Sequence, residues 1–102
     1  MEEKIYSLIS FSGEAKSLLM EVIQLSKKNK FKEANEKLNE AKRKLSKAHN
    51  VQTQLIQKEA AGEQVESSLL LVHAQDHLMN ALMLKDLAAE FSDIYKKIES
   101  KN

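Results

Sequence analysis

Apolar residues recur every seven positions in the middle of the chain, and this spacing constrains the fold more than any other feature. Two series run three residues apart: Phe31, Leu38, Leu45 and Gln52, and Ala34, Ala41, Ala48 and Leu55. Such a heptad repeat places one apolar seam along a helix. The positions between are rich in charges of both signs, which are expected to face water: Lys32, Glu36, Lys37, Glu40, Arg43, Lys44 and Lys47. The segment is therefore predicted to be one helix of a bundle.

Composition favours helices throughout. The 102 residues include no proline and only two glycines, which is typical of long helices rather than sheets. We expect an all-α fold, an antiparallel three-helix bundle, in a single domain spanning residues 1–102. Because the chain has no cysteine, disulfides and thiolate metal sites are excluded.

Helix-ending residues divide the chain into three segments. Periodic apolar residues predict a first helix from about Glu3 to Lys28, and Asn29 is the residue best able to adopt the left-handed conformation that ends it. Gly62 is the natural stop of the second helix. A third helix is expected to start at a cap formed by Ser67 or Ser68 and to reach Lys97.

Several single residues are expected to serve packing alone. Gly13 interrupts the first helix, where glycine costs roughly 1 kcal/mol against alanine, and close approach of a neighbouring helix would explain it. Met20, Met79 and Met83 are expected to fill the core. His49 is interpreted as a structural histidine beside the heptad seam.

Net charge limits the classes of partner. Sixteen Lys and Arg against fifteen Asp and Glu give a formal charge of +1, so no global field attracts nucleic acid or anionic lipid. No signal segment and no apolar stretch of about 18 residues is present, so no membrane insertion is expected. The sequence predicts a soluble, cytoplasmic protein.

The third segment places polar residues in an apolar helix. His73, Asp76, His77 and Asn80 fall at i, i+3, i+4 and i+7, which predicts one polar stripe. Burying an ionised carboxylate costs several kcal/mol unless a partner or metal compensates. The stripe therefore predicts a functional site.

Apolar residues are expected to surround the rest of this helix. They fall on three sides: Leu71, Leu78, Leu82 and Ala89; Val72, Met79 and Met83; and Leu69, Leu84 and Leu87 beside the polar stripe. A helix of a three-helix bundle normally keeps one side for water. We therefore expect a homo-oligomer whose interface is built on the third helix.

Four interpretations of the polar stripe compete. The histidines could be satisfied structural residues, or His73, Asp76 and His77 could bind zinc. A neutral histidine could instead act as a nucleophile and relay a phosphoryl group between proteins; no glycine-rich loop for ATP is present. Finally, the chain could be a helical adaptor that binds partners through the charged second helix. Only the relay requires a histidine that meets solvent and a partner.

Two stretches resemble a known family: LLLVHAQDHLM from Leu69 to Met79 and AHNVQTQLIQKEA from Ala48 to Ala60. They are similar to the IIA component of the lactose/cellobiose class of the bacterial sugar phosphotransferase system. The resemblance extends to Gly13-Glu14-Ala15-Lys16-Ser17 and Lys85-Asp86-Leu87-Ala88. The resemblance is greatest to cellobiose-type members, and lactose and chitobiose types are nearly as similar.

The resemblance implies a role for individual residues. In this family the small carrier HPr phosphorylates the histidine that maps onto His73, and the phosphoryl group then passes to a cysteine of the IIB component. The aspartate that maps onto Asp76 meets its symmetry mates around a divalent metal in a homotrimer. Independently, three carboxylates on an apolar axis would repel one another, and a hard cation such as Mg²⁺ would relieve this.

Two neighbours of His73 are further candidates. His77, one turn later, could donate hydrogen bonds to the phosphoryl oxygens or join the axial cluster. Gln75 could position its neighbours or simply pack. The alternative function is an oligomeric helical adaptor whose polar axis only fixes the register of its subunits.

Overall fold

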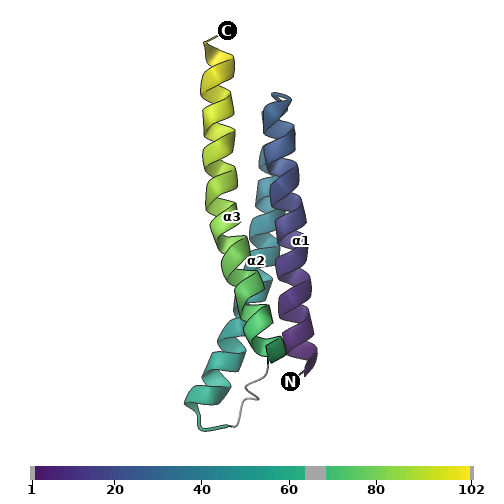
Figure 1. Cartoon of the computed structure of the whole chain (residues 1–102), viewed down its shortest axis with the longest axis vertical. Coiled ribbons are helices and arrows are strands. Elements are labelled where there is room, and N and C mark those ends of the chain that lie inside the picture. The colour runs from purple at the N-terminus through teal and green to yellow at the C-terminus, as the bar shows by residue number, and fades with distance from the viewer. Residues whose placement is uncertain (1, 64–68, 102) are drawn as a thin grey trace.

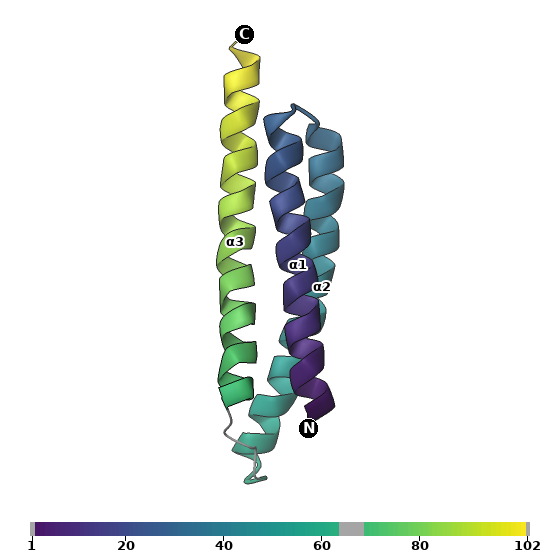
Figure 2. The same ribbon diagram turned by 45° about the vertical axis from the view of Figure 1, so that its right-hand side comes forward.

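Three helices make up the part of the chain that the computed structural model describes, residues 2–63 and 69–101. They are α1 (Glu2–Lys27), α2 (Phe31–Ala60) and α3 (Leu69–Ser100). Successive helices run antiparallel, so α1 and α3 point the same way, and the C-terminal end of α3 projects past the turn that joins α1 to α2 (Figures 1 and 2). The predicted all-α three-helix bundle is confirmed.

The two predicted helix stops have left-handed backbone conformations. Asn29 has φ 61°, and Gly62 has φ 84°. After α1, the backbone N–H of Lys30 donates to the carbonyl of Leu25 at 2.9 Å, and that of Asn29 donates to Ser26 at 3.0 Å. This is the Schellman arrangement, which satisfies carbonyls that a helix end leaves open. A turn of three residues therefore folds α2 back along α1.

The other boundaries differ little from expectation. α1 ends at Lys27 rather than Lys28, and α3 extends to Ser100 rather than Lys97. The first difference is one residue and the second is three, and because helix ends fray such small differences carry little meaning. The predicted caps Ser67 and Ser68 lie outside the described residues.

The heptad seam of α2 faces the core, as predicted. Its buried members are Ala34, Ala41, Leu45, Ala48 and Leu55. They pack with apolar residues of the other two helices, including Ile5, Leu8, Ala15 and Leu19 of α1 and Ala74, Leu78, Ala81 and Ala88 of α3. Small alanines on all three helices let the backbones approach closely.

Several packing predictions were wrong. A Cβ atom at Gly13 would meet no heavy atom within 4 Å, so no neighbouring helix requires a glycine there. Met20, Met79 and Met83 are exposed rather than buried. His49 is also exposed on α2. An apolar residue in the sequence indicates that its side chain favours burial, but it does not show whether the core of the bundle buries it.

The side of α3 that faces away from the bundle is apolar along its whole length. We call this surface the outer stripe: Leu69, Val72, Met79, Met83, Leu87, Phe91, Ile94 and Ile98, all exposed. None of the helices within the described ranges is long and apolar enough to cross a membrane. Exposed apolar surface of this extent is typical of an interaction site.

Candidate functional site

The candidate functional residues of α3 point in different directions around that helix. Successive residues turn by about 100°, so His73 and His77 share one side, Asp76 points along the outer stripe, and Gln75 lies opposite His77. The predicted stripe of His73, Asp76, His77 and Asn80 spans about 100° of the helix, with Asp76 at one edge and His77 at the other. Spacings of three and four residues keep neighbours close, but Asp76 and His77 are adjacent in sequence and diverge by a quarter turn.

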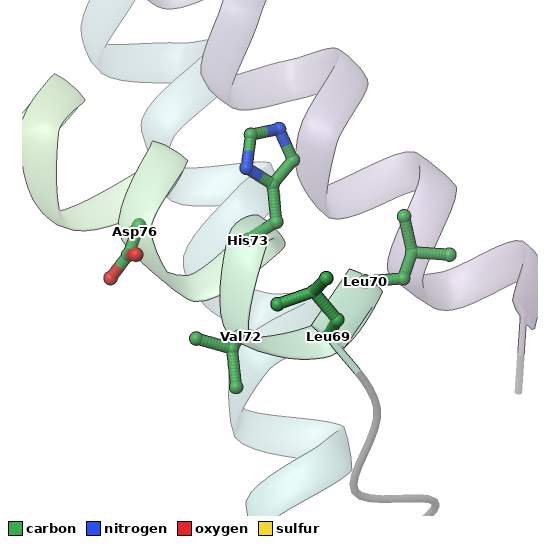
Figure 3. A pocket seen from close by; sticks show the side chains of 5 residues that line it. All are labelled: Leu69, Leu70, Val72, His73 and Asp76. Carbon is green, nitrogen blue, oxygen red and sulfur yellow. The ribbon is translucent and has the colours of Figure 1, made fainter.

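His73 and His77 are in direct contact. Their Nε2 atoms lie 3.0 Å apart, and the rings meet edge to face at 4.4 Å between centroids. His73 is exposed and His77 is half-buried. In Figure 3 the ring of His73 extends toward α1 while Asp76 extends away from it. The pair thus lies where α3 passes α1, with His73 nearer to solvent.

The buried nitrogen of His77 indicates the direction of this hydrogen bond. Its Nδ1 is buried and has no hydrogen-bond partner within the described part of the chain. A proton on Nδ1 would leave a buried N–H group without an acceptor, which is costlier than an unused lone pair. The proton of neutral His77 therefore lies on Nε2 and is donated to Nε2 of His73. This assigns the remaining proton of His73 to its Nδ1.

Burial and nearby charges lower the pKa of His77. Burial is the main cause that lowers the pKa of His77 from its ordinary value, followed by the positive charge of Lys16 and by the charge that His73 carries when it is protonated, while Asp76 opposes them. Lys16 is a half-buried residue of α1. Its electrostatic effect on His77 was not predicted, because periodicity within one helix does not reveal which cation of another helix lies nearby.

Gln75 contacts α2. Its Oε1 accepts a hydrogen bond from Nε2 of Gln52 at 2.7 Å. This partly buried contact joins α2 to α3 on the side of α3 away from the histidine pair. Of the two roles considered for Gln75, packing fits this position.

A pocket opens beside His73. Its lining is largely aliphatic and comprises Leu69, Leu70, Val72, His73 and Asp76 (Figure 3). Because the pocket lies at the start of α3 and continues into the outer stripe, a protein that reaches His73 meets apolar surface around it. Such surface suits contact with a partner chain.

Comparison with known proteins decides the family. Residues 3–96 match the family described as PTS system, Lactose/Cellobiose specific IIA subunit. The chain belongs to this family. As a IIA component, it carries a phosphoryl group in a sugar phosphotransferase system that serves disaccharide uptake.

Related proteins are similar in sequence over nearly the whole chain. The lichenan-specific phosphotransferase enzyme IIA component of Bacillus subtilis is 51% identical, covering 96% of this chain and 89% of its own. The cellobiose-specific enzyme IIA of Bacillus anthracis is 52% identical in sequence, and its crystal structure matches with a TM-score of 0.97. The match covers 99% of this chain and 93% of that one. The Escherichia coli IIA(Chitobiose) in a solution structure with HPr is 35% identical, with a TM-score of 0.84 and coverage of 96% and 95%.

A metal site within one IIA chain finds no support. No group of three or more His, Cys, Asp and Glu residues that could hold an ion occurs among residues 2–63 and 69–101. The zinc alternative needs His73, Asp76 and His77 to converge, whereas Asp76 extends away from His73 (Figure 3). Asp76 can serve a metal only if further ligands come from outside the chain.

Proposed function

We propose that His73 is the residue that accepts and passes on the phosphoryl group. The contact between Nε2 of His73 and Nε2 of His77 carries this assignment. It orients an exposed imidazole that carries its proton on Nδ1, and the hydrogen bond from His77 to the Nε2 lone pair breaks as that nitrogen attacks phosphorus. A neutral imidazole of this kind is a competent nucleophile near pH 7.

Transfer requires two exchanges of one bond each. In the first, Nε2 of His73 attacks the phosphorus of the donor's phosphoryl group. The bond from phosphorus to the donor atom breaks, and its electron pair leaves with the donor. In the second, a thiolate of the IIB component attacks the same phosphorus, and the P–N bond breaks with its electron pair returning to His73. The chain itself supplies no nucleotide and needs none.

His77 is a positioning residue in this scheme. Its Nε2–H first orients the ring of His73 by donating to the attacking nitrogen. When phosphorus bonds to that nitrogen, the same N–H is free to donate to a phosphoryl oxygen. Because its pKa is lowered, His77 stays a single donor rather than becoming a second cation that would need its own partner.

HPr is the proposed donor and a IIB component the proposed acceptor. The solution structure of the Escherichia coli IIA(Chitobiose)–HPr complex contains a relative with the same fold, which supports HPr as partner. The aliphatic pocket beside His73 supports docking of a protein rather than a small molecule. Identities of 51% and 52% to lichenan and cellobiose relatives support a β-glucoside as the transported sugar.

Phosphorylation of two histidine variants tests the assignment. The wild type, incubated with HPr, its kinase and phosphoenolpyruvate, should gain one phosphoryl group by intact mass, stable in alkali and labile in acid. His73→Ala should gain none. His49→Ala, which removes another exposed histidine, should react like the wild type. Full phosphorylation of His73→Ala would refute the assignment.

We further propose that three chains assemble through the outer stripe and hold Mg²⁺ between their Asp76 side chains. Asp76 is exposed in the single chain and lies among Val72, Met79 and Met83. Covering the stripe with copies of itself would bury this carboxylate and bring equal charges together. Oxygen ligands suit a hard cation, which would compensate both costs.

A further inference from the structure

The histidine pair faces a cation on α1. Glu14 binds Lys44 of α2 at 3.2 Å, and Lys47 of α2 lies over the ring of Phe11 at 5.7 Å. These contacts fix the side of α1 that faces α2. Lys16 follows Glu14 by two residues, about 200° around the helix, and so lies on the opposite flank. That flank is where α1 passes α3.

Lys16 has no carboxylate partner in the resting protein. It forms no ion pair within the ranges 2–63 and 69–101, where Lys37, Lys44 and Lys85 each have one. The neighbouring acid Glu14 is already bound to Lys44. Lys16 is nevertheless half-buried, and its charge reaches His77, as described above. Neither histidine offers this half-buried ammonium an opposite charge.

A phosphoryl group on His73 would change this balance. It brings a charge of about −1.5 to −2 and three strong acceptor oxygens. An ammonium is a compact donor of three hydrogen bonds and suits such a group as a point charge. His77 has one N–H to offer, so most of the new negative charge needs another partner. Lys16 is the cation of α1 that faces the pair.

We propose that Lys16 binds the phosphoryl group carried by His73, placing its ammonium against the phosphoryl oxygens across the contact between α1 and α3. The proposal rests on phosphorylation of His73. It makes α1 part of the site: His73 supplies the nucleophile, His77 one oriented donor, and Lys16 the opposite charge. Lys16 thereby stabilises the phosphorylated form relative to the free one.

The transfer equilibrium with phosphorylated HPr measures this effect. Full-length protein is mixed with a known amount of phosphorylated HPr, and both phosphorylated fractions are read by intact mass. In Lys16→Gln the equilibrium constant should fall roughly tenfold, as expected for one lost hydrogen bond to a charged group. Lys16→Arg, which keeps the charge, should stay within about twofold of the wild type on the same scale.

Lys44→Gln is the matched control. Lys44 is also half-buried and at the same level of the bundle, but it pairs with Glu14 on the α2 side, so its loss should leave the equilibrium within about twofold of the wild type. Equal losses in Lys16→Gln and Lys44→Gln would show an effect of net charge and overturn the proposal. So would an unchanged equilibrium in Lys16→Gln.

Two further observations keep the test decisive. If Lys16→Gln loses its helical circular dichroism, Lys16→Met replaces it, because methionine preserves the apolar stem that packs along the helix. The same tenfold loss is expected there, and its absence overturns the proposal. Failure of the wild type itself to accept a phosphoryl group would instead refute the function proposed above, and this inference with it.

Discussion

The outer surfaces of α2 and α3 differ although the two helices are similar in length. Away from the core, α2 presents mixed charges, and among its residues, all of which the structure describes, Ile56 is the one exposed large apolar side chain. α3 exposes eight, the members of the outer stripe. A helix that packs only against the other helices of its own bundle needs one apolar seam. The second apolar surface of α3 is the surface through which we propose that the chains assemble.

Charge placed on the outer stripe should separate the chains, and this is the largest effect we expect. Met83, 67% exposed in the single chain, would lie in the subunit interface, where an ammonium costs several kcal/mol in every copy. Sedimentation equilibrium at micromolar concentration should give the mass of three 11.6 kDa chains for the wild type and of one chain for Met83→Lys.

The comparable substitution on α2 provides the control. Ile56 is 54% exposed, so Ile56→Lys places the same charge on the surface that we expect to face water. It should assemble like the wild type. A wild type that sediments as one chain, or equal dissociation of both variants, would remove the distinction between the two helices.

Replacing Asp76 by leucine would make the outer stripe continuously apolar. A well-packed apolar residue in place of a buried charge is often neutral or stabilising by about 1 to 4 kcal/mol. Thermal melts should show that a chelator destabilises the wild type and leaves Asp76→Leu unchanged.

An acidic residue of α2 again serves as the reference. Glu36 is exposed on the charged side of that helix, and Glu36→Leu should keep the chelator sensitivity of the wild type without gaining stability. Equal chelator sensitivity in wild type and Asp76→Leu would show that Asp76 is not the ligand of any bound ion.

The smallest effect concerns the contact between the two helices. Gln75→Leu removes the acceptor of the 2.7 Å hydrogen bond from Gln52 and should cost about 1 kcal/mol in the free energy of unfolding. Gln52→Leu should cost about the same amount, and the double variant less than the sum. Denaturant titrations give these values.

Phosphorylation separates the packing role of Gln75 from a catalytic one. Both glutamine variants should accept the phosphoryl group at the rate of the wild type, because the contact lies on the side of α3 away from His73. A loss of rate confined to Gln75→Leu would instead indicate that Gln75 reaches the phosphoryl group.

The fold was predictable because each signal was local. The heptad seam of α2 identified its buried side, and Asn29 and Gly62 ended two helices at the residues where the backbone turns left-handed. Gly13 shows the limit of the same reasoning. A glycine within a helix suggests that a side chain would not fit there. Whether one fits depends on the neighbouring helix, and the space beside Gly13 is open.

The sequence indicated which side chains of the candidate site lie near one another within α3, but not how they lie against α1. The histidine spacing indicated the contact of His73 with His77, which the structure contains at 3.0 Å. The position of Asp76 among exposed apolar residues and the approach of Lys16 depend on how α3 is rotated against α1. That rotation is set by packing across helices, which no pattern within one helix encodes.

The turn at Asn29 has a consequence for the order of folding. Only three residues join α1 to α2, and loops this short close on a time scale of about 10–100 ns. The α1–α2 hairpin can therefore form early, while α3 must close a longer connection before it docks. Until chains meet, α3 presents its apolar outside to water. In the proposed trimer the last step of folding is an association of chains, so the thermal midpoint should rise with protein concentration by mass action.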